Sequence, residues 1–306
     1  MSKAYILSVC IPTYNRAEFL EKSLKLLARM MTADVELVIG DDASTDGTKK
    51  IVEEFIRLNK KINVKYIRSN KRLSFDRNVI KIVNSASGKF CWLLGDDDLP
   101  KKNCISRIKS VISRYPNTSL VHLNYSCYDN LLHRVVAARM VKEIHKDVLF
   151  RSGFEFYFRE TKNSYFKYLG TNTITVCSDV INRKRWLAAL KETRKFIGYN
   201  FIHSFLIAKM IMHPNSVYFI SDPQVQYTAN NARVWPNSIW EDYNRVLLGY
   251  LLKLGYPKVK INEMKKSNRT YIQREAFMKN KYLKYIYAFA RPLYYRLRYL
   301  KNILSA

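Results

Sequence analysis

The 306-residue sequence has few acidic residues and no long apolar run. Asp and Glu total 25 against 53 Lys and Arg, which gives a formal net charge of +28. A charge of this size calls for an anionic partner, such as nucleic acid, a phosphorylated substrate or an acidic membrane surface. No stretch reaches the roughly 18 to 20 consecutive apolar residues of a membrane-spanning helix. The sequence therefore predicts no transmembrane segment.

Cysteine is also scarce, and its spacing is uninformative. The five cysteines are odd in number, widely separated and form no Cys-x-x-Cys pair. This pattern indicates neither a disulfide framework nor a zinc site, and it predicts five reduced thiols. The apolar run at 5–11 is short and has no cleavage site after it. We therefore expect no signal peptide and a cytoplasmic location.

Apolar runs of strand length alternate with segments of helical period through the first 235 residues. This alternation indicates βαβ units and a mainly parallel sheet of the α/β class. The expected strands are 5–11, 35–39, 64–67, 90–94, 119–124, 173–177 and 217–220. The expected helices are 19–27, 48–58, 76–84, 180–192 and 200–211.

Polar residues follow three of these strands, at the edge of the sheet where ligands bind in parallel α/β proteins. They are Pro12–Arg16, Asp41–Asp46 and Asp96–Asp98. Three adjacent carboxylates repel one another, and a divalent cation bound through oxygen relieves that repulsion. Such a cation completes its coordination with substrate phosphates. The run 96–98 therefore predicts a metal–diphosphate site, and a solvated acidic turn is the alternative.

The segment 41–47 lacks the glycine spacing of a Walker or Rossmann phosphate loop. Its aspartates do not suit phosphate, but they are able to accept hydrogen bonds from a base or a ribose. The alternative is a helix N-terminus, with Ser44 or Asp46 as the cap.

Four segments together resemble the family-2 nucleotide-sugar glycosyltransferases. They are SVCIPTYNR at 8–16, DDASTDGT at 41–48, DRN at 76–78 and WLLGDDD at 92–98, in the family's order and spacing. The run Cys91–Asp98 is most similar to the abequosyltransferase-type branch, which builds O-antigen and related surface glycans. The resemblance is specific over 5–100 and looser to about residue 230, and it says almost nothing about 236–306.

The resemblance implies a GT-A fold over 1–235, with a Rossmann-like nucleotide-binding half (1–100) and an acceptor half (101–235). It implies Mn²⁺ or Mg²⁺ as cofactor and an inverting single displacement. By position, Asp97 and Asp98 would hold the metal, and Asp97 and Arg77 would act in catalysis. The nucleotide-sugar-binding residues that it implies are Pro12, Thr13, Tyr14, Asn15, Arg16, Asp41, Asp42, Arg77, Asn78 and Asp96.

Two positions depart from the family pattern. Asn70 is followed by Lys71 and Arg72, where the family often has a glycine. The acidic pair that usually supplies the catalytic base is not evident after Gly198, where the sequence reads YNFIH.

His203 closes that segment and is the first candidate for the base, because an unperturbed imidazole is mostly neutral at pH 7 and accepts a proton. A core or acceptor-binding histidine is the alternative. Asp129 and Asp179 are weaker candidates. The other histidines show no metal-ligand spacing, and we expect structural roles for them.

The C-terminal region 236–306 is expected to form basic amphipathic helices. Residues 253–306 hold fourteen Lys and Arg against two Glu, with aromatic residues interleaved. Basic helices with aromatic faces lie in membrane interfaces, and anionic lipid strengthens their binding. We expect this region to associate with the inner face of the cell membrane, and packing on the catalytic domain is the alternative.

Together these features predict inverting, metal-dependent transfer of a sugar from a nucleotide-sugar donor. The acceptor would be a glycan or a polyprenyl-diphosphate-linked glycan in surface polysaccharide assembly. The alternative is a basic nucleic-acid-binding or membrane-binding protein without transferase activity, since basic and aromatic residues also suit single-stranded nucleic acid. No nucleic-acid-binding motif is present, so we expect no nucleic acid partner.

Overall fold

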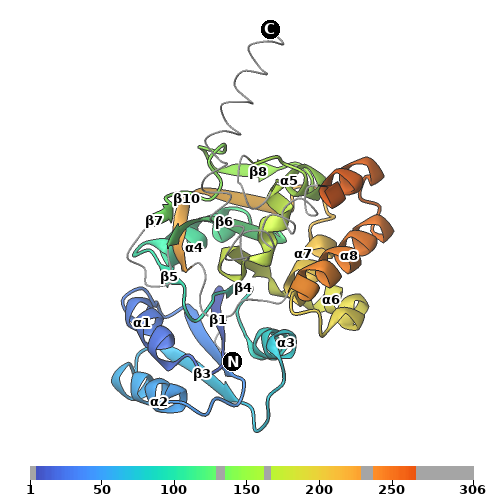
Figure 1. Ribbon diagram of the computed structural model, residues 1–306. Helices are drawn as coiled ribbons and strands as arrows, with labels where there is room; N and C mark the ends of the chain where they lie inside the picture. The colour runs from blue at the N-terminus through green and yellow to red at the C-terminus, as the bar shows by residue number, and fades with distance from the viewer. Residues whose placement is uncertain (1–4, 129–134, 162–166, 229–236, 267–306) are drawn as a thin grey trace, which may run out of the picture.

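Ten strands between residues 7 and 228 pair into one sheet (Figure 1). The computed structural model describes residues 5–128, 135–161, 167–228 and 237–266, with 237–244 described by their backbone. The sheet order is β3-β2-β1-β4-β9-β6-β10-β5, with β7 on β6 and β8 on β10. The strands are β1 (Leu7–Thr13), β2 (Val35–Asp41), β3 (Asn63–Arg68), β4 (Phe90–Leu93), β5 (Leu99–Pro100), β6 (Leu120–Tyr128), β7 (Val135–Ala137), β8 (Val148–Phe150), β9 (Asp179–Asn182) and β10 (Val217–Thr228).

Most of the central strands are parallel. β1 pairs in parallel with β2 and β4, β2 with β3, and β6 with β10. β9 lies between β4 and β6 and is antiparallel to both. The α/β class and the mainly parallel sheet are therefore confirmed, with an antiparallel strand inside the sheet that the sequence did not predict.

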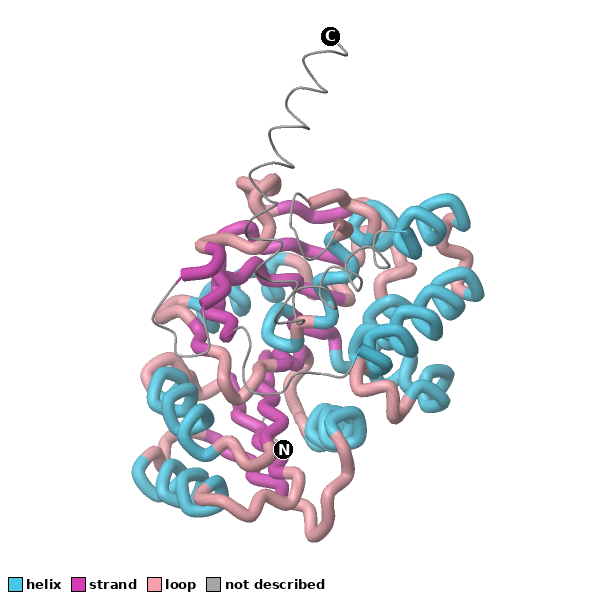
Figure 2. The backbone as a smooth tube through the Cα atoms, in the orientation of Figure 1, coloured by secondary structure: helices cyan, strands magenta, loops and turns pink. Residues whose placement is uncertain are grey.

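Helices cover both faces of this sheet (Figure 2). Helices α1 (Ala17–Ala28), α2 (Thr48–Leu58) and α4 (Cys104–Arg114) contribute to one core cluster. The other cluster contains residues of α3 (Phe75–Ser85), α5 (Gly153–Tyr157), α6 (Arg183–Thr193), α7 (Ile202–Met210) and α8 (Asn237–Lys253). Along β1, Val9 and Ile11 face the first cluster and Cys10 the second, as the period of two in a strand requires. All five cysteines are buried and free.

One strand prediction is wrong. Residues 173–177 fall in two 3₁₀ turns, η1 (Leu169–Ile174) and η2 (Val176–Ser178), and the strand is β9, over the following residues. The helix expected at 180–192 begins only after that strand, at Arg183. The physical reason is that β9 hides a polar residue: Asp179 is fully buried and pairs with His122 of β6.

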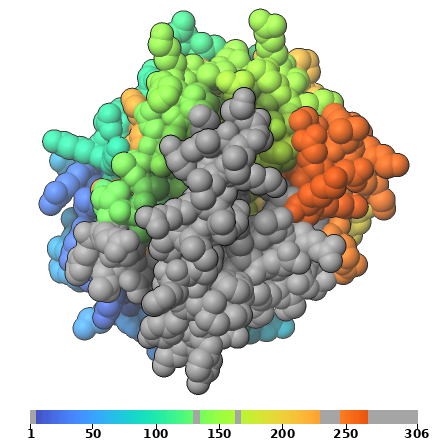
Figure 3. Space-filling view, turned by 45° about the horizontal axis from the view of Figure 1, so that its top comes forward, coloured from blue at the N-terminus to red at the C-terminus, as the bar shows by residue number. Residues whose placement is uncertain are grey.

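The described part of the C-terminal region packs on the sheet domain. Leu247, Leu251, Tyr256, Ile261 and Met264 are buried in the second core cluster. The rings of Phe154 and Tyr256 contact each other, and in Figure 3 the orange surface of this segment adjoins the yellow-green surface of the α5 region. Among the described residues no helix has the length and apolarity to cross a bilayer. Residues 267–306 lie outside the described residues, so the proposed membrane helices and the boundary at 235 stay predictions.

Candidate functional site

The carboxyl ends of β1 and β4 bring two of the predicted clusters together. The Thr13 hydroxyl donates to Asp96 Oδ2 at 2.7 Å. Arg16 forms a hydrogen-bonded ion pair with Asp97, and its Nε lies 3.5 Å from Asp96 Oδ1. Because β1 and β4 are parallel neighbours, residues that follow each strand meet at one edge of the sheet. The four side chains therefore form the centre of the candidate site.

Arg16 is held from a second side by an aromatic ring. Its guanidinium carbon lies 4.4 Å from the centroid of the Phe19 ring, on the first turn of α1. The side chains of Arg16 and Asp97 are 12% and 19% exposed. A partly desolvated cation between two carboxylates offsets much of the repulsion between them.

Asp98 differs from its two neighbours because it is buried. Its exposed fraction is 3%, and Oδ1 accepts a long hydrogen bond of 3.4 Å from the backbone N–H of Thr228. Burial, followed by the charge of Asp97, raises the pKa of Asp98 well above its ordinary value. A Cβ on Gly95 would lie 2.3 Å from the Asp98 carboxylate, so this turn requires glycine. Asp98 thus faces into the protein rather than toward solvent.

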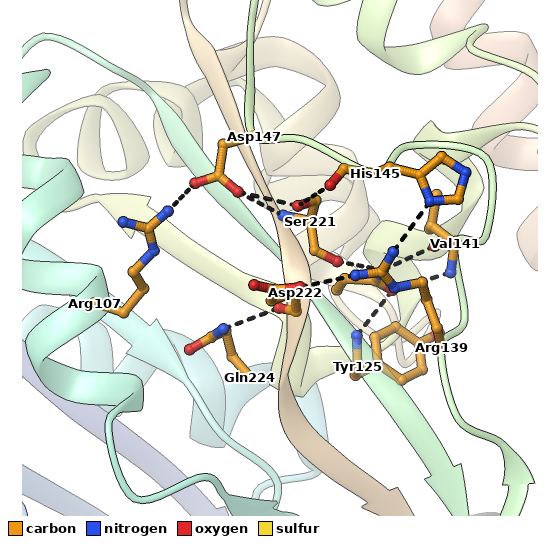
Figure 4. A network of polar contacts seen from close by, with 10 residues as sticks. Arg107, Tyr125, Arg139, Val141, His145, Asp147, Ser221, Asp222 and Gln224 are labelled. Atoms are coloured by element: carbon orange, nitrogen blue, oxygen red, sulfur yellow. Dashed lines mark hydrogen bonds and ion pairs between the residues drawn. The ribbon is translucent and has the colours of Figure 1, made fainter.

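Thr228, at the end of β10, is a site residue that the sequence did not reveal. Its hydroxyl donates to the backbone oxygen of Asp97 at 2.8 Å. The register of β10 against β6 shifts between Ile220 and Val225, and a polar network holds the shifted segment (Figure 4). Asp147 accepts from Ser221 N at 3.0 Å and pairs with Arg107. These contacts fix the course along which β10 reaches the aspartate run.

The carboxylate of Asp41 is fully engaged inside the protein. Oδ1 accepts from Ser44 N at 2.7 Å, and Oδ2 accepts from Tyr66 OH at 2.6 Å with Arg68 Nε at 3.3 Å. Asp41 is 0% exposed. Its observed contacts hold the turn after β2, and its predicted contact with the base stays a prediction. Tyr66 and Arg68 were missed in the sequence, although they close β3 at the same edge of the sheet.

Asp42 likewise organises a neighbouring loop. Its two oxygens accept from the backbone N–H groups of Leu73 at 2.6 Å and Ser74 at 3.1 Å. Ser74 has a φ of +93°, a strained conformation for a residue with a side chain. Backbone strain of this kind concentrates at binding sites, and the hydrogen bond from Ser74 N to the Asp42 carboxylate holds Ser74 in its strained conformation.

Asn15 connects the first polar cluster to the second. It has a φ of +51°, its side-chain oxygen accepts from Thr45 N at 2.7 Å, and its N–H donates to Ser44 Oγ at 3.0 Å. Pro12 is buried in β1 opposite Gly40. The loop that departs from the family pattern also reaches this area, since the Arg72 guanidinium lies 4.1 Å from the centroid of the Tyr14 ring.

Arg77 and Asn78 lie on α3 but have different environments. Arg77 is exposed and has no hydrogen-bond or ion-pair partner within the described part of the chain. Asn78 is 2% exposed and donates to the Gly40 backbone oxygen at 2.7 Å. A Cβ on Gly40 would lie 2.5 Å from Asn78 Oδ1, so Gly40 allows this close approach. Arg77 is thus accessible to a ligand, whereas Asn78 supports the strand end.

Asp76, next to Arg77, has a structural role that the sequence did not predict. It is fully buried, and its carboxylate accepts from the backbone N–H groups of Gly198 at 2.8 Å, Asn200 at 3.0 Å and Ile202 at 3.1 Å. Burial raises the pKa of Asp76, and these hydrogen bonds oppose the rise. This carboxylate therefore anchors the segment that leads into α7. The sequence signal was the DRN segment at 76–78, to which the resemblance assigned roles only for Arg77 and Asn78.

His203 lies in the core, in the first turn of α7, rather than at the site centre. It is 0% exposed, Nε2 donates to the Ile174 backbone oxygen at 3.1 Å, and Nδ1 is buried without a hydrogen-bond partner. The Phe75 ring packs edge-on against the imidazole. A general base must lie within hydrogen-bond reach of the proton that it takes. The catalytic role of His203 stays a prediction, and it requires that Nδ1 become accessible.

The burial of His203 predicts a pH dependence of stability. Burial lowers its pKa to about 4, below the ordinary value of about 6.5. Between these two pH values the unfolded chain binds a proton that the folded protein does not. The contribution of His203 to the unfolding free energy is therefore complete above about pH 6.5 and is lost as the pH falls toward about 4. The unfolding free energy of the wild type should fall by about 3 kcal/mol relative to His203→Gln between pH 7 and pH 4. Urea denaturation of both proteins across this range checks it, and parallel curves would contradict it.

Asp179, one of the two weaker candidates for the base, is buried in the core and paired with a histidine. Asp179 is 0% exposed, accepts from His122 Nδ1 at 2.8 Å, and burial raises its pKa to about 6. Its other oxygen and His122 Nε2 are both buried without a partner. Asp129 lies outside the described residues.

The aspartate run by itself does not form a closed metal site. Over the described ranges, no three His, Cys, Asp or Glu side chains gather closely enough to hold a metal ion. The run offers one partly exposed carboxylate, Asp97, and a second, Asp96, that is 9% exposed. This set suits a cation that takes one or two carboxylates from the protein and its remaining ligands from a substrate.

Comparison with known proteins identifies proteins that are similar to this chain in sequence or in fold. The chain is 27% identical to the abequosyltransferase RfbV of Salmonella typhimurium over 229 residues, which cover 74% of this chain and 67% of RfbV. Its fold is similar to that of residues 1–349 of S. aureus TarS in complex with UDP-GlcNAc, with a TM-score of 0.65 and 19% identity over 90% of this chain and 76% of TarS.

A mannosyltransferase from Pyrobaculum calidifontis in complex with GDP-Man and Mn²⁺ is also similar, with a TM-score of 0.52 and 16% identity over 94% of this chain and 80% of that one. These structures share the α/β fold of this chain. The model of the family described as Glycosyl transferase family 2 matches residues 8–189. That match takes in β1, β2, β4, α3 and the aspartate run, and the chain therefore belongs to Glycosyl transferase family 2.

Proposed function

We propose that this protein transfers a sugar from a nucleotide-sugar donor to an acceptor hydroxyl in the assembly of a surface glycan. The observation that carries the proposal is the cluster of Thr13, Arg16, Asp96 and Asp97 at the carboxyl ends of β1 and β4. This is the edge of an α/β sheet where nucleotides bind. Two proteins with the same fold were solved with UDP-GlcNAc and with GDP-Man, which supports a nucleoside diphosphate sugar as donor.

A divalent cation, Mn²⁺ or Mg²⁺, is part of the proposal. Asp97 fits such an ion because its carboxylate is a hard oxygen donor, partly exposed at the strand end. Asp98 is buried against Thr228, and its role as a second ligand stays a prediction. When bound, the cation supplies positive charge opposite the diphosphate that leaves. A structural relative contains Mn²⁺ together with its donor, which supports this cofactor.

The chain's own residues would bind and orient the donor. The Thr13 hydroxyl donates to Asp96 at this edge, and we propose that Asp96 contacts the ribose of the donor. Arg77 is exposed on α3, and we propose that its charge stabilises a leaving diphosphate. We propose a single inverting displacement, in which the acceptor oxygen forms its bond to the anomeric carbon as the donor's bond to the diphosphate breaks. A base has to take the proton of the acceptor hydroxyl, and His203 is the candidate. His203 is buried, so it would have to become accessible to the acceptor.

The acceptor that we propose is a glycan, either free or linked to a polyprenyl diphosphate. Similarity to a GalNAc(5)-diNAcBac-PP-undecaprenol beta-1,3-glucosyltransferase of Campylobacter jejuni, 30% identical over 121 residues, supports a lipid-linked glycan acceptor. The segment 253–306 carries fourteen basic residues against two acidic ones, and it would hold the protein at the anionic inner face of the cell membrane. Flotation with anionic and neutral liposomes at two salt concentrations tests this, and equal binding to both liposomes would contradict it.

A screen of nucleotide sugars tests the proposed activity. Purified protein is incubated with each donor and Mn²⁺, and release of the nucleoside diphosphate is measured with and without EDTA. We expect at least one donor to be hydrolysed or transferred and EDTA to stop the reaction, because the cation offsets charge on the leaving group. Full activity in EDTA would contradict the metal. A lack of any response, with no thermal stabilisation by any nucleoside diphosphate, would contradict the function.

A further inference from the structure

The positively charged side chain of Arg16 is already paired with Asp96 and Asp97. The Arg16 guanidinium contacts Asp97 through one terminal nitrogen and lies 3.5 Å from Asp96 through Nε. The neighbouring basic residue on α1, Lys22, lies 6.0 Å from the centroid of the same Phe19 ring and forms no contact with either aspartate. The most accessible carboxylate of the run, Asp97, is therefore paired with Arg16.

We propose that Arg16 is a resident counter-cation that shields Asp97 in the nucleotide-free protein and releases it when a diphosphate arrives. The proposal rests on the proposed function, because it concerns the same metal–diphosphate site. A divalent cation and the Arg16 guanidinium compete for the Asp97 carboxylate, since two cations bound to one carboxylate repel each other. Metal alone should therefore bind weakly while Arg16 remains on Asp97.

The chemistry of the guanidinium explains why a diphosphate would change this. A guanidinium forms paired hydrogen bonds to phosphate oxygens as readily as to a carboxylate. A diphosphate that accepts from Arg16 removes the competitor from Asp97 and adds oxygen ligands for the metal. Stacking on Phe19 keeps Arg16 at the site while its partner changes. Metal and diphosphate should thus raise each other's affinity by the same factor.

Binding of Mn²⁺ alone tests the proposal without a donor sugar. The free Mn²⁺ signal in electron paramagnetic resonance is titrated with wild type, Arg16→Gln and Lys22→Gln, each with and without inorganic pyrophosphate. We expect Arg16→Gln to bind Mn²⁺ alone at least about tenfold more tightly than wild type and to lose most of the coupling to pyrophosphate. Lys22→Gln removes the same charge next to the same Phe19 ring and should resemble wild type.

A charge-conserving variant separates a counter-cation from a residue that merely packs. Arg16→Lys retains the positive charge but not the planar fork, so its affinity for Mn²⁺ alone should stay as weak as that of wild type, with a smaller pyrophosphate effect. Circular dichroism and thermal melting show whether each variant folds. Equal Mn²⁺ affinity of Arg16→Gln and Lys22→Gln would overturn the exchange while leaving the transferase proposal intact. Absence of Mn²⁺ binding by wild type with pyrophosphate would overturn both the exchange and the metal.

Discussion

Replacement of Asp97 by asparagine should reduce sugar transfer by about 10²- to 10³-fold, the range observed when one electrostatic contact to a developing charge is removed. Asp97 is the partly exposed carboxylate of the run, and it is the metal ligand that we propose. The amide of asparagine keeps the shape of the side chain and lacks the negative charge. The measurement is kcat/KM with the donor found in the screen, over a series of Mn²⁺ concentrations.

Asp222→Asn is the matched control for this variant. Asp222→Asn removes the same charge as Asp97→Asn. Asp222 lies on the irregular part of β10, pairs with Arg139 and has a side chain that is 81% exposed (Figure 4). Exposed ion pairs of this kind contribute little to stability, so activity should stay within about twofold of wild type. An Asp97→Asn enzyme with normal kcat/KM at all Mn²⁺ concentrations would exclude Asp97 from metal binding.

Replacement of Asp76 by alanine should destabilise the protein by about 2–4 kcal/mol, because buried donors lose their acceptor. Three backbone N–H groups of 198–202 donate to this carboxylate. Water is able to replace it at the exposed Gly198, whereas Ile202 is buried and its N–H would remain unpaired. Urea denaturation at pH 7 measures the loss of unfolding free energy.

Asp76→Asn provides the graded control for this prediction. The amide keeps one oxygen as acceptor and places an NH₂ group against the remaining donors, so its stability should lie between that of wild type and that of Asp76→Ala. A change of less than about 0.5 kcal/mol in Asp76→Ala, the range of ordinary surface substitutions, would show that the three hydrogen bonds do not hold this segment.

The first hundred residues were the most predictable part of the chain. Strands β1 to β4 and helices α1 to α3 follow apolar runs and helical periods that are local in sequence. Polar residues at the strand ends identified the site, because parallel strands bring their carboxyl ends to one edge of the sheet. The match of residues 8–189 to the family decides for a transferase over a nucleic-acid-binding protein.

Errors arose where local pattern and tertiary pairing disagree. The alternating residues at 173–177 are typical of a strand, but the space between β4 and β6 is taken by β9. Asp179 concealed that strand because an aspartate is unusual in a buried strand, and its hydrogen-bond partner His122 is 57 residues away in the sequence. Helix α4 was missed although Ile105, Ile108, Val111 and Ile112 recur at helical spacing and are buried.

The small number of acidic residues takes on a specific meaning in the structure. Sequence alone determined that aspartates concentrate at the strand ends, since charge and spacing are properties of the chain. Tertiary structure decided which aspartates remain accessible: Asp41, Asp42, Asp76 and Asp98 are buried and accept from neighbouring backbone, and Asp97 is left partly exposed beside Arg16. The reason is that a carboxylate's role depends on its donors, and those donors come from segments far apart in sequence, such as Tyr66, Ile202 and Thr228.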